Sequence, residues 1–206
     1  MENLKKVFMF ANYTPADGSI GITKKIRSEI SALRKMGKVV TYTAYDGDGV
    51  SIFNNDDNVI FHKKFPTPIN ALNRKIRYYW LENVAFHYLK TTQPFDLGYI
   101  RMSIPNGLMF EIFKQLKTQG AEIIAETLAY FPGIRYKSLN GKYIMFSYKK
   151  NSDKFKEYVS YFLVEGNMTE LHNVKAYTMN MGVEVDNISL HNYEGDKNSL
   201  KSYFRR

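Results

Sequence analysis

The sequence contains no cysteine, so the chain can form neither disulfide bonds nor thiolate metal sites. This absence excludes a secreted scaffold held together by disulfides, and it is typical of proteins that stay in the cytoplasm. No window approaches the roughly 18 to 20 consecutive apolar residues that a membrane-spanning helix needs. The N-terminus carries charges where a signal peptide would need an apolar core. We therefore expect a cytoplasmic protein.

Acidic residues are scarce relative to basic ones, 20 against 29, and the formal charge is +9. The stretch 63–77 contains no acid, and three aromatic residues follow it directly. A second basic and aromatic stretch spans 135–156 and contains one acid, Asp153. Such surfaces aid solubility, or bind anionic lipid headgroups, nucleic acid or pyrophosphate groups. No nucleic-acid-binding module accompanies the charges, so we expect no nucleic-acid partner and favour peripheral attachment to the anionic inner face of the membrane.

The 206 residues, 44% apolar and 15% aromatic, suit one domain with a substantial core. Within the stretch 5–11, two lysines are followed by the unbroken apolar run 7–11, which predicts a strand buried on both faces. A polar bend containing Gly18, Ser19 and Gly21 follows, and then a helix that ends before Gly37. One stripe of that helix is apolar and consists of Ile22, Ile26, Ile30 and Leu33.

The glycines of the bend have two interpretations. Without a Cβ, Gly18 and Gly21 let a ligand approach the backbone at the start of a helix, where free N–H groups suit a phosphate or carboxylate. Alternatively, they only let the chain turn. Their Gly-x-x-Gly spacing matches neither the dinucleotide fingerprint nor the Walker pattern, which disfavours a different phosphate-binding Rossmann enzyme.

Alternating strands and helices predict an α/β fold, a Rossmann-like, doubly wound and mostly parallel sheet. We expect further strands at 38–45, 59–61, 95–101, 121–126, 159–164 and 174–179, and further helices at 69–90 and 108–116. The helix at 69–90 should bury one face, made of Leu72, Ile76, Trp80, Val84 and His87. The stretch 134–158 shows no clear pattern. We assign 1–186 to the domain and 187–206, where the apolar pattern thins, to a linker or tail.

Asp46 and Asp48 lie in a turn and could share a divalent cation, as a metal-dependent transferase would require. A calcium loop starting at Asp46 would need Gly and Glu at its sixth and twelfth positions, where this chain has Ser51 and Asp57. We therefore predict no metal site, and we expect no cofactor.

Ligands of doubly wound sheets bind beyond the carboxyl ends of the strands. Arg101 and Ser103 lie at one such end, and Glu126 lies at another. The guanidinium of Arg101 suits a phosphate or carboxylate, and Glu126 could accept sugar hydroxyls or a proton. Each could instead be a structural residue.

In its order of elements the chain resembles the N-terminal half of GT-B glycosyltransferases of the group 1, family 4 type. The likeness rests on the opening strand, loop and helix, on Phe95 to Arg101, and on Met179 to Asp186, which resembles the family's Asn-Gly-Val-Asp signature. The signature is altered by Met181 and Glu184. Many relatives also have a histidine after the fourth strand, where this chain has Arg101, so no catalytic residue is assigned.

The resemblance implies the acceptor-side domain of an enzyme that moves a sugar from a nucleotide-sugar donor to a glycan or lipid-linked acceptor, as in cell-surface polysaccharide synthesis. Gly18, Ser19 and Gly21 would then border the cleft, Arg101 and Ser103 would line it, and Glu126 would face the acceptor. The family's C-terminal donor-binding domain has no counterpart after Asp186, so we expect this chain alone to be inactive. The alternative is a non-catalytic accessory module that docks on a partner transferase through an exposed apolar face.

Overall fold

The computed structural model describes residues 5–15, 21–66, 74–127, 139–164 and 168–178. The strands within these ranges are β1 (Lys6–Phe10), β2 (Val39–Asp46), β3 (Gly49–Phe53), β4 (Val59–Lys64), β5 (Leu97–Met102), β6 (Glu122–Thr127), β7 (Tyr161–Val164), β8 (Glu170–Leu171) and β9 (Val174–Thr178). The helices are α1 (Gly21–Lys35), α2 (Arg74–Thr91), α3 (Gly107–Thr118), α4 (Leu139–Lys150) and α5 (Ser152–Tyr158). The predicted tail at 187–206 lies outside the described residues.

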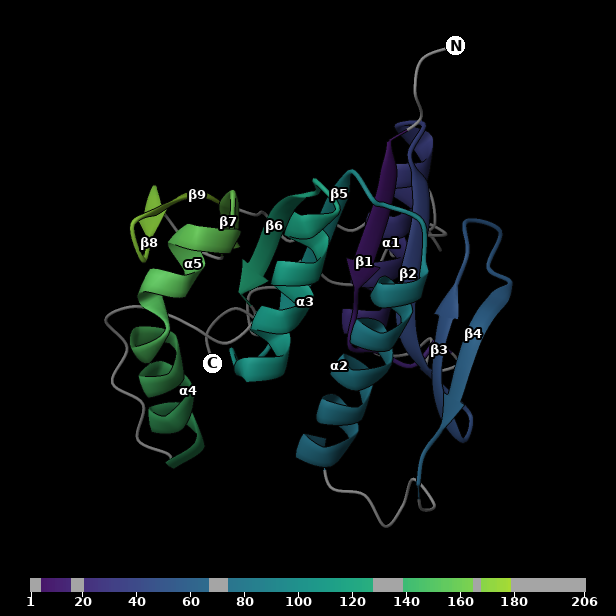
Figure 1. Cartoon of the computed structure of the whole chain (residues 1–206), viewed down its shortest axis with the longest axis horizontal. Coiled ribbons are helices and arrows are strands. Elements are labelled where there is room, and N and C mark those ends of the chain that lie inside the picture. The colour runs from purple at the N-terminus through teal and green to yellow at the C-terminus, as the bar shows by residue number, and fades with distance from the viewer. Residues whose placement is uncertain (1–4, 16–20, 67–73, 128–138, 165–167, 179–206) are drawn as a thin grey trace, which may run out of the picture.

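All these strands belong to one sheet, in the order β4-β3-β2-β1-β5-β6-β7-β9-β8 (Figure 1). The pairs from β2 through β1, β5, β6 and β7 to β9 are parallel. Antiparallel pairing occurs at the edges, where β3 joins β2 and β4, and β8 joins β9. The predicted α/β fold with a Rossmann-like, mostly parallel sheet is therefore confirmed.

Two short strands at the sheet edges were not predicted, and both belong to hairpins. β3 follows β2 through a two-residue turn in which Gly47 has φ +55°, a left-handed conformation that glycine adopts without steric cost. β8 joins β9 through His172 and Asn173, both at positive φ. The turn at Asp46 to Gly49 was predicted, but the strand after it was not.

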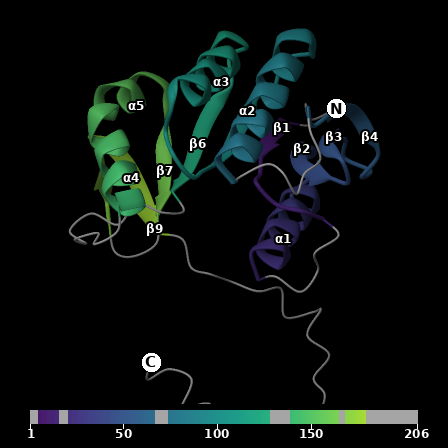
Figure 2. The same ribbon diagram turned by 90° about the horizontal axis from the view of Figure 1, so that it is seen from below.

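Helices cover both faces of the sheet, with α1 below it and α2, α3 and α5 above it in Figure 2. An apolar layer lies on each face. Ile26 and Ile30 of α1 pack on Val7, Met9 and Val40 of the central strands. The layer on the opposite face is larger, and its buried side chains include Phe8, Phe10, Leu81, Leu89, Ile100, Phe113, Phe155 and Phe162. The central strands are thus buried on both faces, which explains their unbroken apolar sequences.

Glycine ends two of the helices, and the sequence predicted the end at Gly37. Gly37 and Gly120 adopt φ +71° and +87° directly after α1 and α3. In each case the following amide, that of Lys38 or Ala121, bonds a carbonyl five residues back, which is the Schellman arrangement.

The predicted buried face of α2 is only partly correct. Val84 is buried and Trp80 is half-buried, but Ile76 is 44% exposed and His87 is also exposed. Leu72 lies outside the described residues. The structure instead buries the stripe formed by Tyr78, Leu81, Glu82, Ala85 and Leu89. Because aromatic residues surround this helix, spacing alone could not identify the inner face, which is set by packing on the sheet and on α3. Among the described helices, none is both long and apolar enough to cross a bilayer.

Candidate functional site

The centre of the sheet contains the topological switch point of the fold. β1 pairs with β2 on one side and with β5 on the other, so the connections that leave β1 and β5 diverge at the carboxyl edge. Thr43 of β2 fixes the end of β1, because its buried hydroxyl accepts from the Ala11 amide at 2.9 Å and donates to the Ala11 carbonyl at 3.0 Å. In doubly wound sheets this edge is where ligands bind.

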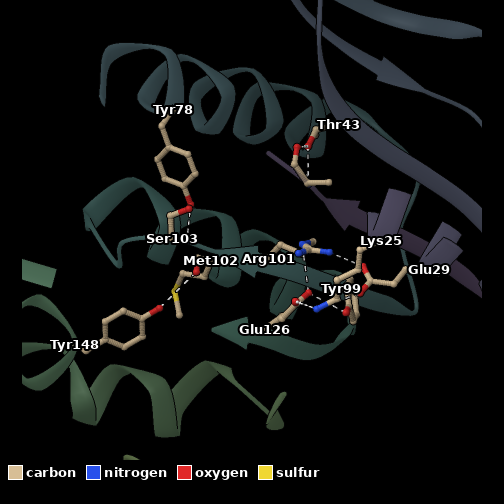
Figure 3. Close-up of polar contacts among 11 residues, drawn as sticks. Lys25, Glu29, Thr43, Tyr78, Tyr99, Arg101, Met102, Ser103, Glu126 and Tyr148 are labelled. Carbon is tan, nitrogen blue, oxygen red and sulfur yellow. Dashed lines mark hydrogen bonds and ion pairs between the residues drawn. The ribbon is translucent and has the colours of Figure 1, made fainter. Parts of the chain in front are cut away.

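Arg101 and Glu126 lie together at this edge, on the face that α1 covers. They are register partners on β5 and β6, and the Arg101 Nε lies 3.3 Å from Glu126 Oε2. Nη1 of Arg101 also donates to Glu29 Oε2 of α1 at 2.7 Å. The guanidinium therefore bridges a strand carboxylate and a helix carboxylate (Figure 3).

Lys25 and Tyr99 complete this group of charges. Lys25 Nζ donates to Glu126 Oε1 at 2.9 Å and lies 3.9 Å from Glu29 Oε1. The Tyr99 hydroxyl donates to Glu126 Oε2 at 3.0 Å. We call Lys25, Glu29, Tyr99, Arg101 and Glu126 the charged network; its two cations balance its two carboxylates.

The charged network meets solvent only through α1. The side chains of Arg101 and Glu126 are 1% and 0% exposed, whereas those of Lys25 and Glu29 are 13% and 20% exposed. Burial raises the pKa of Glu29, although the neighbouring Arg101 guanidinium acts in the opposite direction. Removing one partner of a buried ion pair typically costs about 3–5 kcal/mol, because the other charge is left uncompensated.

Local geometry explains why these residues meet. Lys25 and Glu29 are one helical turn apart and lie beside the buried Ile26 and Ile30, so they point toward the sheet. Side chains alternate along a strand, and the α1 face of β5 therefore carries both Tyr99 and Arg101. Parallel pairing of β5 with β6 then brings Glu126 into contact.

On the opposite face, α2 and α4 hold the loop after β5. The Ser103 amide donates to the Tyr78 hydroxyl of α2 at 3.2 Å. From α4, the Tyr148 hydroxyl donates to the Met102 carbonyl at 3.5 Å, and the Ser147 hydroxyl donates to the Pro105 carbonyl. Figure 3 shows Tyr78 and Tyr148 reaching the end of β5 from two helices.

A buried carboxyl group lies behind this loop. Glu82 of α2 is 0% exposed, and both of its oxygens accept from Asn106 Nδ2, at 2.8 and 2.9 Å. Asn106 is also the N-cap of α3, because its Oδ1 accepts from the Met109 amide at 3.0 Å. Burial raises the pKa of Glu82 to about 8.

Of the predicted site residues, the structure brings together Arg101 and Glu126. Ser103 is half-buried in the loop beyond Arg101, on the far side from α1. Gly21 begins α1 and is exposed, with open space where a Cβ would lie. Gly18 and Ser19 lie outside the described residues. The ligand-binding roles assigned to these residues stay predictions.

Both aspartates of the β2–β3 hairpin have partners from neighbouring residues. Asp46 accepts from the Ser51 hydroxyl at 2.9 Å. Asp48 pairs with Lys64 at 2.9 Å and with His62 at 3.3 Å. Within the described ranges, no group of three or more His, Cys, Asp or Glu side chains could hold a metal ion.

Sequence reasoning missed Lys25, Glu29, Tyr99, Glu82 and Asn106. Two signals could have found some of them. Lys25 and Glu29 each stand next to a residue of the predicted apolar stripe of α1, and Glu82 is the single acid between residues 74 and 91. An acid in a helix this rich in aromatic residues indicates a buried carboxyl group with a specific hydrogen-bond partner, because an unpartnered buried polar group is costly.

Comparisons with known proteins give little further information. No family model matches the chain, and no curated protein matches it. One solved structure that it resembles is a protein of Thermotoga maritima described as a possible 1-phosphofructokinase, with 15% sequence identity and a TM-score of 0.24. That match covers 79% of this chain and 55% of the other. The fold description above therefore rests on the structure of this chain itself.

Proposed function

We propose that this chain is the acceptor-side domain of a glycosyltransferase that moves a sugar from a nucleotide-sugar donor to a glycan or lipid-linked acceptor. The observation that supports this proposal is the charged network at the carboxyl ends of β5 and β6, where α1 contributes Lys25 and Glu29. Buried charges cost desolvation energy, and functional sites are among the places where proteins retain them. The resemblance in the order of elements supplies the reaction class.

The chemistry of the network suits a polar acceptor. Glu29, at the solvent boundary, has a carboxylate that can accept hydrogen bonds from sugar hydroxyls. A phosphate or carboxylate of the acceptor would take the place of Glu29 on Nη1 of Arg101, and Lys25 would supply a second positive charge. Catalytic groups and most donor contacts would come from a second domain, so the chain alone should not transfer sugar.

The test is to measure acceptor binding by isothermal titration calorimetry. We would titrate the chain with neutral oligosaccharides and with a short-chain prenyl diphosphate-linked sugar. Arg101→Lys removes the planar fork while keeping the charge, and we expect it to weaken binding by about tenfold, which corresponds to roughly 1.4 kcal/mol. The matched control is Arg34→Lys, because Arg34 pairs with Asp57 at the far end of α1; it should bind as the wild type does.

Glu29→Gln gives a second variant at the partly exposed rim of the network, in case Arg101→Lys fails to fold. Circular dichroism and thermal unfolding would establish that each variant is native. Absence of binding by every acceptor probe, or equal losses in Arg34→Lys and Arg101→Lys, would overturn the proposal.

A further inference from the structure

Large apolar side chains are exposed on two helices that are far apart in the sequence. Ile76 and Tyr79 of α2 are 44% and 56% exposed. Tyr143 and Phe146 of α4 are 53% and 61% exposed. In each helix the two residues are three apart, so they lie on one side of it. Figure 1 shows α4 and the start of α2 at the same end of the molecule, on either side of the start of α3.

Positive charge accompanies these side chains. Lys142 and Lys149 are exposed on α4, seven residues apart and therefore on one side of it. From α2, Lys75 places its Nζ 5.8 Å from the ring centroid of Tyr143, which shows that the two helices approach each other here. We define the α2–α4 surface by six residues: Ile76, Tyr79, Lys142, Tyr143, Phe146 and Lys149.

Acids are missing from the same region. The sequence of α4 contains none, and the single acid of α2, Glu82, is buried against Asn106. Among the described residues, the exposed charges of α2 and α4 are therefore all positive, while the exposed acids nearby, Glu111 and Asp153, belong to α3 and α5. A surface of this kind is complementary to an anionic partner that also accepts apolar groups.

The α2–α4 surface is directly connected to the candidate site. Tyr79 and Phe146 face outward, whereas the nearby Tyr78 and Tyr148 face inward and hold the loop after β5. A partner that docks on the outer side of these helices would therefore lie close to the carboxyl edge of β5.

We propose that the α2–α4 surface docks on an anionic lipid bilayer. Tyrosine and phenylalanine are well suited to the interface between headgroups and acyl chains, where the ring is apolar and the tyrosine hydroxyl stays hydrated. The lysines are attracted by the negative surface potential of phosphatidylserine or phosphatidylglycerol membranes. A nucleic acid would bind by stacking its bases on aromatic rings, and the aliphatic side chain of Ile76 cannot stack in this way. An exposed aliphatic side chain therefore favours a lipid bilayer over a nucleic acid. The inference does not depend on sugar transfer, because lipid binding is measured without any acceptor.

The test is sedimentation with vesicles of equal parts phosphatidylcholine and phosphatidylglycerol, compared with vesicles of phosphatidylcholine alone. We expect the wild type to bind the anionic vesicles and to dissociate as salt is raised. Lys142→Glu with Lys149→Glu should weaken binding by at least about tenfold, since each substitution reverses a charge near the surface. The control pair, Lys24→Glu with Lys35→Glu on α1, lies on the opposite face of the sheet, changes the net charge equally and should keep binding.

Two further variants test insertion of the apolar residues. Tyr79→Ser with Phe146→Ser should also lose vesicle binding, whereas Val59→Ser with Ile60→Ser, at exposed positions of β4, should not. In Phe146→Trp, brominated acyl chains should quench the new fluorescence. Equal losses in control and test pairs, absence of vesicle binding by the wild type, or binding to a single-stranded oligonucleotide but not to vesicles would each overturn the proposal.

Discussion

A single acid, Glu82, should make the stability of this protein depend on pH. Burial raises its pKa from 4.5 to about 8 in the folded chain. The unfolded chain releases this proton near the ordinary value, so between these pKa values it binds fewer protons than the folded chain. Stability should therefore fall as pH rises from about 5 to about 8, by roughly 4 kcal/mol, and then level off.

Glu82→Gln should remove the contribution of Glu82 to the pH dependence, because an amide mimics the protonated acid; Glu29, whose pKa burial also raises, keeps its own contribution. We expect similar urea midpoints for variant and wild type near about pH 5, and a more stable variant near about pH 9. Glu111→Gln, an exposed acid on α3, is the control and should follow the wild type throughout. A wild type whose midpoint stays constant across this range would contradict the prediction.

At the level of single residues, the sequence predicted only part of the candidate site. Arg101 and Glu126 could be selected because the carboxyl end of a predicted strand is visible in the pattern. Their partners could not, because Glu29 lies 72 residues from Arg101 and Lys25 lies 101 residues from Glu126. Such pairs depend on which face α1 covers, and that depends on the handedness of the connection between strands.

Among the elements, the edge hairpin β3–β4 depends on a close approach of two backbones. A Cβ on Gly49 would overlap the Lys63 carbonyl oxygen, which belongs to the neighbouring strand and cannot move alone. A Cβ on Gly98 of β5 would lie 2.6 Å from Leu116 Cδ1, at the end of a side chain that can rotate. Gly49→Ala should therefore destabilise the fold by about 1–3 kcal/mol, and more than Gly98→Ala does. Denaturant unfolding of both variants checks the order, and the reverse order would contradict it.

The elements that sequence predicted well are those whose burial is uniform. The central strands are apolar throughout because both faces are covered, and α1 has one clear stripe. Prediction failed where a segment is only partly buried, or where apolar residues lie on several sides of a helix. β8 is a two-residue edge strand, and β3 belongs to the hairpin at the other edge. α4 and α5 mix basic with aromatic residues, and α2 is aromatic on every side. In these segments tertiary packing decides the structure, and local pattern contains too little information.

Across the whole molecule, stability should decrease from the centre of the sheet to its edges. β1 and β5 have hydrogen-bonded neighbours on both sides, and helices cover both faces. At one edge, β4 is largely exposed. Hydrogen exchange followed by mass spectrometry should find the amides of β1 and β5 at least about a hundredfold more protected than those of β4 and β8. Uniform protection across the sheet would contradict this expectation.

The position of β1 in the sheet also has a consequence for synthesis on the ribosome. Residues 6–10 can pair with β2 soon after both emerge, but their second partner, residues 97–102, lies about 90 positions later in the chain. At roughly 5–20 residues per second, the ribosome needs about 5 to 18 seconds to translate that interval. Throughout it, one edge of β1, whose last four residues are buried in the folded protein, has no native partner. This interval is when the nascent chain most needs a chaperone.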